Sequence, residues 1–298
     1  MYSHFDSDTW VTPFGLIFVA AMLVAWRFAR HNAAKSGIDR SHVDLLVPVT
    51  VIVGVAGGSV VAMLMPMDHM LAGEMMNHGI RIRLFGMLAT GAVAVCFYSR
   101  VSNLSFRQLL DIFALPTLAA LMIHRVGCFL AGCCWGDIVS RDALSGFATQ
   151  IQTVPLISSL SAGVQYPPGS LPFEQHLAMG LIEPGALASL PVVPVQLYES
   201  ALLFIVLLAL WRFPWRDYPR GTIAVIVTCT YAVLRFFIEY LRADGHIMMG
   251  NLTITQLQCL LLMSSALLLP GMLKASYHRV HAADDIDRGS DEDLRRRI

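Results

Sequence analysis

Apolar runs of membrane-spanning length dominate this sequence and limit the folds that it can adopt. A helix that crosses a bilayer needs about 20 mostly apolar residues. Six runs near that length are Val11–Ala29, Leu45–Met65, Phe113–Cys134, Val195–Trp211, Gly221–Leu241 and Leu252–Leu273. A seventh, shorter run, Leu84–Ser99, is counted because it brings both chain ends to the sides that the charges indicate. The sequence therefore predicts an all-α membrane protein with seven transmembrane helices.

The composition agrees with this class. Hydrophobic residues make up 56% of the 298 residues and charged residues only 14%, whereas about a quarter of the residues in soluble domains are charged. The formal net charge is zero, which gives no electrostatic reason to expect a nucleic-acid partner.

The distribution of Lys and Arg predicts the orientation of the helices. Cytoplasmic loops of membrane proteins carry an excess of these residues. Most of the 21 Lys and Arg residues follow the first, third, fifth and seventh runs, and the opposite side holds only Arg81, Arg83, Arg141 and Arg242. We therefore expect the N-terminus outside and the C-terminus in the cytoplasm. Because the first ten residues lack the basic region of a cleaved signal peptide, we expect the first run to stay as an anchor.

The same pattern divides the chain into four parts. Residues 1–136 contain helices one to four, residues 137–193 form an exoplasmic loop, and residues 194–274 contain helices five to seven. The loop is longer than ordinary connections, and its interspersed apolar residues predict a small folded cap. Residues 275–298 form a highly charged tail that we expect to be cytoplasmic and disordered.

The stretch from His124 to Gly136 closes the fourth run and combines unusual residue types. It holds Arg125 at membrane depth, the glycines Gly127, Gly132 and Gly136, and three cysteines. An arginine in a membrane helix costs a few kcal/mol, and glycines allow a backbone or a ligand to approach closely. We therefore expect an anionic ligand to meet the chain here.

Two further segments carry acids and bases at membrane depth. Residues four apart share one helix face, so Tyr231, Arg235 and Glu239 form a polar stripe with Arg242 one turn beyond. Glu199 follows Pro194 at the start of the fifth helix. Two simpler interpretations stay open: an Arg–Glu pair that only neutralises itself, and a glutamate that only stabilises a helix N-terminus. Together with Arg125, however, these groups could bind an anionic headgroup and keep a carboxylate as a base.

The cysteines raise a redox or metal interpretation, which the spacing does not favour. Cys96, Cys229 and Cys259 lie in apolar runs and are expected to be buried. Adjacent cysteines such as Cys133 and Cys134 rarely form a disulfide, and the spacing with Cys128 and His124 matches no zinc template. We therefore expect small residues at a close-packed helix end, with no metal and no cofactor. A membrane thiol or metal protein remains the alternative.

Four motifs in register resemble those of the prolipoprotein diacylglyceryl transferase family. They are Arg125-Val-Gly-Cys-Phe-Leu-Ala-Gly-Cys-Cys-Trp-Gly136, Gly163-Val-Gln-Tyr-Pro167, Gln196-Leu-Tyr-Glu199 and Arg235-Phe-Phe-Ile-Glu239-Tyr-Leu-Arg242. Phe14-Gly-Leu and the paired Gly57-Gly58 look like the start of that family, so the likeness extends from about Pro13 to Leu273.

The resemblance implies an enzyme of the bacterial inner membrane whose partners are phosphatidylglycerol, lipobox-containing preprolipoproteins and membrane lipids. Such an enzyme moves the diacylglyceryl group from phosphatidylglycerol to the lipobox cysteine thiol, and glycerol 1-phosphate leaves.

The resemblance also implies roles for single residues. It assigns Arg125 and Arg235 to the phosphate, and Glu199 and Glu239 to the arginines or the thiol proton. Tyr231 would bond the headgroup, and Arg242 would guide it. The remaining residues expected at the headgroup are Gly127, Gly132, Gly136, Gln196 and Tyr198.

Several positions differ from the family pattern. They are Phe14, Ser59, Phe85, Cys128, Cys133 and Val193. These substitutions remove hydrogen-bond donors and a candidate histidine base, for which His78 is a possible replacement, but they keep the arginines and glutamates. They leave an alternative open, a divergent relative that acts on or binds another phospholipid headgroup without this reaction.

Overall fold

The computed structural model describes residues 13–64, 72–139, 163–212, 218–242, 247–249 and 252–268. The predicted disordered tail, 275–298, lies outside these residues, and so does the part of the predicted cap from 140 to 162. The side chains of His78 and Phe85 also lie outside the described part of the chain.

Each predicted apolar run contains a helix, so the all-α class is confirmed. The helices are α1 Pro13–Lys35, α2 Arg40–Leu64, α3 Ala72–Val101, α4 Phe106–Ala131, the short α7 Leu171–Ala178, α8 Val195–Trp211, α9 Thr222–Ile238 and a final helix, Ile254–Leu268. A 3-10 turn, η3 Glu239–Leu241, continues α9. The strands β1 Ile247–Met249 and β2 Leu252–Thr253 form a small antiparallel hairpin that the sequence did not predict.

Length and apolar composition identify the helices that can cross a membrane. In the described part of the chain, the segments Phe14–Lys35, Arg40–Val60, Phe106–Ala131 and Thr222–Leu241 are long and apolar enough. The shorter apolar helices are Gly86–Val101, Val195–Trp211 and Ile254–Leu268. Large apolar side chains such as Ile52, Phe97 and Leu261 leave most of their surface exposed, which suits contact with lipid. The chain is therefore a multi-pass membrane protein, and seven spans and their orientation stay predictions.

Helix α4 begins seven residues before the predicted run, because polar residues in its first turns interrupt the apolar pattern. Those polar residues bond to neighbouring segments. The Asp111 carboxylate accepts hydrogen bonds from the backbone N–H groups of Gly221 at 2.5 Å and Ala224 at 2.9 Å. Backbone N–H groups at a helix start have no partner within the helix, and Gly221 has no side chain to supply one. A carboxylate from α4 therefore caps α9.

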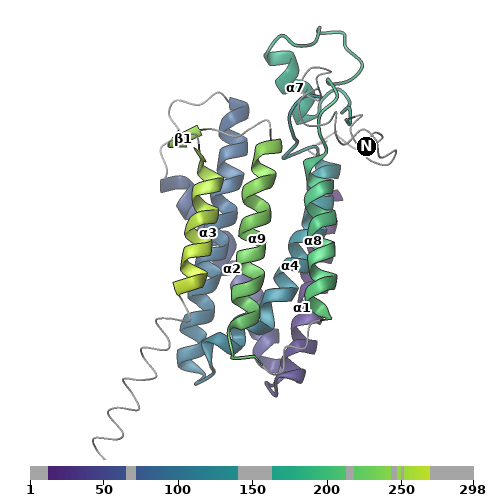
Figure 1. Ribbon diagram of the computed structural model, residues 1–298. Helices are drawn as coiled ribbons and strands as arrows, with labels where there is room; N and C mark the ends of the chain where they lie inside the picture. The colour runs from purple at the N-terminus through teal and green to yellow at the C-terminus, as the bar shows by residue number, and fades with distance from the viewer. Residues whose placement is uncertain are drawn as a thin grey trace, which may run out of the picture.

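Figure 1 shows the long helices side by side as an upright bundle, with α7 and β1 at one end of it. Helix α4 packs against α1, α8, α9 and α3. One apolar core joins α4, α8 and α9 through buried residues such as Leu118, Leu203 and Val227. A second core joins the start of α4 to the first three helices through residues such as Leu46 and Leu109. α4 is therefore the element that links the halves of the bundle.

The described residues after α4 form a compact unit at the end of the bundle that carries α7. Trp135, Tyr166 and Val192 make a buried cluster there. Backbone bridges join Val192 to both Ile138 and Val164. Another bridge joins Gly136 to Arg242, which fixes the unit to the end of α9. The exoplasmic placement of this unit is still a prediction.

Candidate functional site

The first ion pair of the site joins α4 to α8. Arg125 Nε lies 2.9 Å from Glu199 Oε1, although the two groups lack the alignment of a hydrogen bond. Arg125 and Glu199 expose only 4% and 2% of their surface. A buried charge without a counter-charge is strongly unfavourable, so each residue requires the other. Glu199 therefore does more than begin a helix, because it neutralises an arginine on another helix.

The second ion pair lies at the end of α9. Arg235 Nη2 is 2.9 Å from Glu239 Oε2, one helical turn away, and Arg242 Nε is 3.7 Å from the same oxygen. The hydroxyl of Thr253 donates a 3.2 Å hydrogen bond to Glu239 Oε1. The predicted stripe thus includes a real Arg–Glu pair, and the glutamate is shared between two arginines.

Tyr231 connects the two ion pairs. Its buried phenol interacts electrostatically with Glu199, Arg125 and Arg235. The cluster formed by these residues with Glu239 and Arg242 contains more arginines than glutamates. Guanidinium groups gathered in a buried cluster can bind the oxygens of an anionic ligand.

Unused hydrogen-bonding capacity remains inside this cluster. Among the residues that the structure describes, Arg235 Nη1 and Glu199 Oε2 have no hydrogen-bond partner. Buried polar groups in folded proteins are nearly always hydrogen-bonded, so exceptions require an explanation. A free N–H face on a guanidinium can bind a phosphate oxygen, and a free carboxylate oxygen can accept a proton.

Two of the predicted headgroup residues, Gln196 and Tyr198, differ in how deeply they are buried. The Gln196 side chain is buried and its Nε2 donates a 2.6 Å hydrogen bond to the Cys133 carbonyl. Gln196 Oε1 and the Tyr166 hydroxyl approach each other without forming a hydrogen bond. Burial raises the pKa of the Tyr166 phenol to about 12, so this phenol stays protonated. Tyr198 is half-buried on α8.

The three predicted glycines lie where protein atoms approach closely. Gly132 ends α4 in the left-handed conformation, with φ of +66°, and a Cβ there would lie 3.3 Å from the ring of Tyr166. A Cβ on Gly127 would lie 3.1 Å from Ile17 Cγ2 of α1. These contacts give each glycine a reason in packing alone, and lipid binding by these glycines stays a prediction.

A substitution at Gly136 tests this close packing most directly. A Cβ there would lie 2.4 Å from Val195 Cγ2 and 2.6 Å from the Leu241 carbonyl oxygen. Gly136→Ala should therefore lower the free energy of unfolding by about 1–3 kcal/mol, as overpacking does. Gly185→Ala is the matched control, because no atom lies within 4 Å of its Cβ position. Thermal unfolding in detergent should show a loss only for Gly136→Ala, and equal midpoints would contradict the packing explanation.

The three cysteines of the stretch come together, which their spacing did not predict. The Sγ atoms of Cys128, Cys133 and Cys134 all lie within 4.8 Å of one another, and all three are free thiols. Cys134 has a left-handed backbone, with φ of +61°. Hydrogen bonds from the other two thiols hold the pKa of the Cys134 thiol well below its usual range, and the charges of Arg242 and Arg125 lower it further.

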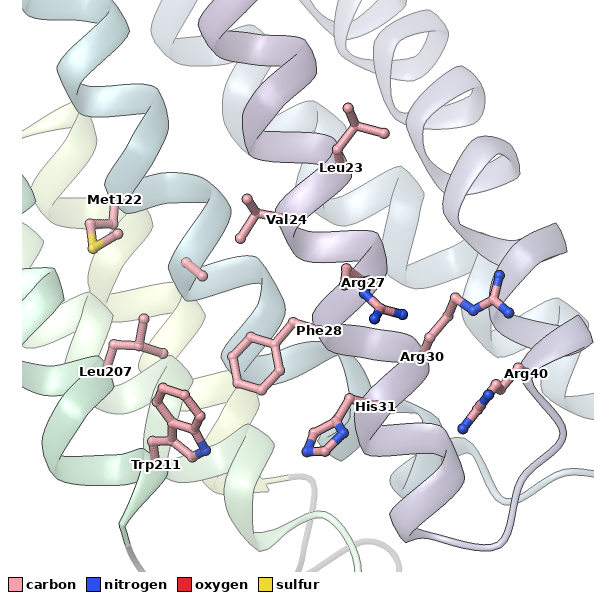
Figure 2. Close-up of a pocket in the computed structure, with 11 residues that line it drawn as sticks. Leu23, Val24, Arg27, Phe28, Arg30, His31, Arg40, Met122, Leu207 and Trp211 are labelled. Atoms are coloured by element: carbon pink, nitrogen blue, oxygen red, sulfur yellow. The ribbon is translucent and has the colours of Figure 1, made fainter.

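A groove of about 790 Å³ lies apart from the charged cluster, between α1, α4 and α8. Figure 2 shows Leu23, Val24 and Phe28 on α1 opposite Met122, Leu207 and Trp211. Arg27, Arg30, His31 and Arg40 gather at one end. The groove is therefore apolar along its walls and cationic at that end, a combination that suits a lipid.

Sequence reasoning missed two polar residues that support Glu239. Thr253 bonds the carboxylate itself, and Gln256 Oε1 accepts a 3.0 Å hydrogen bond from the Thr253 backbone N–H. Both residues are buried. The sequence feature that could have revealed them is the polar stretch Thr-Ile-Thr-Gln at the start of an apolar run. Buried polar residues in membrane segments usually have functional or structural partners.

Comparison with known proteins identifies the family of this chain. A family model described as prolipoprotein diacylglyceryl transferase matches residues 4–270. The chain belongs to this family.

Three relatives illustrate how distant the known members are. The phosphatidylglycerol–prolipoprotein diacylglyceryl transferase of Nitratidesulfovibrio vulgaris is 27% identical over 273 residues, covering 87% of this chain and 89% of the relative. The protein of the same name from Xanthomonas oryzae pv. oryzae is 27% identical over 279 residues, covering 87% and 86%. That of Clostridium tetani is 22% identical over 233 residues, covering 78% and 80%.

The positions that depart from the family pattern have ordinary packing roles where the structure describes them. The Phe14 ring packs edge-on against His124, with centroids 5.3 Å apart. The Ser59 hydroxyl donates to the Val55 carbonyl of its own helix. Val193 pairs through its backbone with Gly136 and Asp137. Cys128 and Cys133 differ from these, because together with Cys134 they form a cluster of three free thiols.

Proposed function

We propose that this chain transfers the diacylglyceryl group of phosphatidylglycerol to the lipobox cysteine thiol of preprolipoproteins at the bacterial inner membrane. The thiol sulfur attacks the glyceryl CH₂ carbon that carries the phosphate. A C–S bond forms, the C–O bond to the phosphate breaks, and glycerol 1-phosphate leaves with the electron pair. The thiol proton passes to a base, and the product is a thioether.

The observation that carries this proposal is the buried cluster built on Arg125 and Arg235, in which Arg235 Nη1 has no hydrogen-bond partner among the described residues. Charge develops on the departing phosphate in this reaction. Arginines already fixed near that position stabilise it without reorganising at the moment of reaction. Glu199 and Glu239 hold the two guanidinium groups at 2.9 Å, so the arginines are oriented before the lipid binds.

The remaining residues of the cluster have supporting roles in this proposal. Arg235 Nη1, which has no hydrogen-bond partner among the described residues, binds a phosphate oxygen in this proposal. Glu199 Oε2, equally unpartnered, is the candidate acceptor for the thiol proton. Tyr231 lies between the two pairs and can donate to the headgroup. Arg242 adds charge at the mouth of the cluster and guides the headgroup toward it.

A reconstituted assay tests the reaction directly. The purified chain in phosphatidylglycerol-containing detergent or lipid is mixed with a lipobox peptide, and the product is sought by mass spectrometry. We expect a peptide whose mass has increased by the diacylglyceryl group, and equal release of glycerol 1-phosphate. A peptide in which serine replaces the lipobox cysteine is the matched control and should stay unmodified.

The outcome also distinguishes the alternative of a divergent relative. If a known member of the family makes the thioether under the same conditions and this chain does not, the transferase proposal is wrong. Phospholipid that stays bound to the inactive chain through purification, and is identified by lipid mass spectrometry, would then indicate a relative that binds another headgroup.

A further inference from the structure

The strongest unexplained feature outside the proposed reaction is the thiol cluster at the end of α4. The proposed transfer uses the thiol of the substrate, and none of its steps needs a cysteine of this chain. Cys128 and Cys134 are buried and Cys133 is half-buried. Three thiols with Sγ atoms within 4.8 Å of one another are close enough to bind one metal ion together. Thiolate sulfur prefers soft ions such as copper(I) and zinc(II).

A nearby imidazole lies beside one of the three thiols, although it is outside the group whose ligand atoms all lie within 4.8 Å of one another. His124 Nε2 lies 3.5 Å from Cys128 Sγ, because residues four apart share one helix face. Zinc binds sulfur at about 2.3 Å and nitrogen at about 2.0 Å, so a tetrahedral zinc ion separates these two ligand atoms by about 3.5 Å. The rings of Phe14 and Phe18 pack edge-on against His124, which limits the positions that the imidazole can take.

The backbone holds these groups in place without a metal. The N–H groups of Gly132 and Cys133 bond carbonyls of the last turn of α4, which closes the helix end. Gln196 Nε2 bonds the Cys133 carbonyl and ties this turn to α8. Bringing the three sulfur atoms to the separation of about 3.8 Å found around zinc needs movements of about 1 Å or less.

The electrostatic surroundings also favour a metal site. Three thiolates around a divalent ion leave one negative charge, and a neutral imidazole adds none. The cationic side chains of Arg125 and Arg242 interact with Cys134 and reduce the cost of that charge, although each also pairs with a glutamate.

We propose that Cys128, Cys133 and Cys134 bind a thiophilic metal ion, with His124 as the fourth ligand when the ion is zinc. Binding releases the remaining thiol protons to solvent. The ion fixes the turn between α4 and the cap. It thereby holds Arg125, which precedes Cys128 on α4 by three residues. This site is additional to the proposed transferase chemistry and does not depend on it.

Metal content of the purified full-length chain tests this site. The chain is reduced, incubated with zinc, freed of excess ion and analysed by elemental mass spectrometry beside a Cys128→Ser/Cys133→Ser/Cys134→Ser variant. We expect about one zinc per chain that the triple variant loses. Cys96→Ser and Cys229→Ser, outside the cluster, are matched controls and should keep the zinc. Cobalt substitution should give thiolate charge-transfer absorption only where the cluster is intact.

His124 is tested separately with two ions. His124→Ala should weaken zinc binding at least about tenfold, measured by competition with a chromophoric chelator. Copper(I) binding, which three thiolates can satisfy, should change less. Equal weakening for both ions would overturn the role of His124.

One result would overturn the whole site. Equal zinc content in the reduced wild-type chain and the triple variant, with both retaining the same thermal unfolding midpoint before zinc is added, would show that the thiols hold no ion. None of these measurements uses transferase activity, so failure of the metal site and failure of the proposed reaction are distinguishable.

Discussion

Replacing Arg125 with methionine is expected to lower the free energy of unfolding by about 3–5 kcal/mol. The change leaves the Glu199 carboxylate, which is 2% exposed, without the guanidinium at 2.9 Å. Glu199→Gln should cost a similar amount, because it leaves the arginine buried without its counter-charge. The double variant removes both charges, and apolar or neutral replacements of a buried ion pair are often tolerated. It should therefore recover most of the lost stability.

Thermal and denaturant unfolding of the wild type, both single variants and the double variant in one detergent give the coupling between the two residues. The matched control is Arg30→Met, in a pair with Asp44 at 3.2 Å whose side chains are 29% and 38% exposed. Exposed pairs contribute about 0–1 kcal/mol, so this change should have little effect. A double variant as unstable as the two single losses combined would contradict the coupling of Arg125 to Glu199.

The same double variant separates stability from catalysis. It should fold but show no diacylglyceryl transfer, because it lacks both one of the two arginines of the phosphate site and the carboxylate proposed to accept the thiol proton. A folded double variant with wild-type turnover would remove Arg125 from the proposed phosphate site and leave it a purely structural residue.

The second large effect is expected at Arg235, where charge and shape can be tested apart. Arg235→Lys keeps a positive charge beside Glu239, so the unfolding midpoint should change little. It loses the planar fork, whose Nη2 pairs with Glu239 while Nη1 is free for a phosphate oxygen. A lysine cannot serve both groups in that geometry. We expect kcat/KM for phosphatidylglycerol to fall about a hundredfold, as when one donor to a developing anion is removed.

Steady-state kinetics with varied phosphatidylglycerol and a fixed lipobox peptide measure this loss. A fall in kcat itself indicates an interaction made in the transition state, whereas a rise in KM alone indicates ground-state binding. Arg212→Lys is the matched control, because Arg212 is exposed at the end of α8. Unchanged kcat/KM in Arg235→Lys would contradict a forked contact between this arginine and the phosphate.

The helices could be predicted because a bilayer imposes a simple rule on local sequence. Every apolar run of suitable length holds a helix, and the shorter run after Arg83 does as well. The boundaries were less accurate where polar residues have distant partners. Asp111 is charged, so it lies outside the predicted apolar run. Its partners, the first N–H groups of α9, are more than one hundred residues away in the sequence. No local pattern contains that information.

The sequence by itself determined the helical class, the family resemblance and the pairing within one helix. Arg235 and Glu239 could be paired from their spacing, because four residues make one turn of a helix. Only the tertiary structure decided that Arg125 pairs with Glu199 and that three thiols meet at the end of α4. Those contacts depend on how α4 and α8 pack and on how the chain turns after Gly132. The stretch from His124 to Gly136 is therefore both one side of a charged cluster and a proposed metal site.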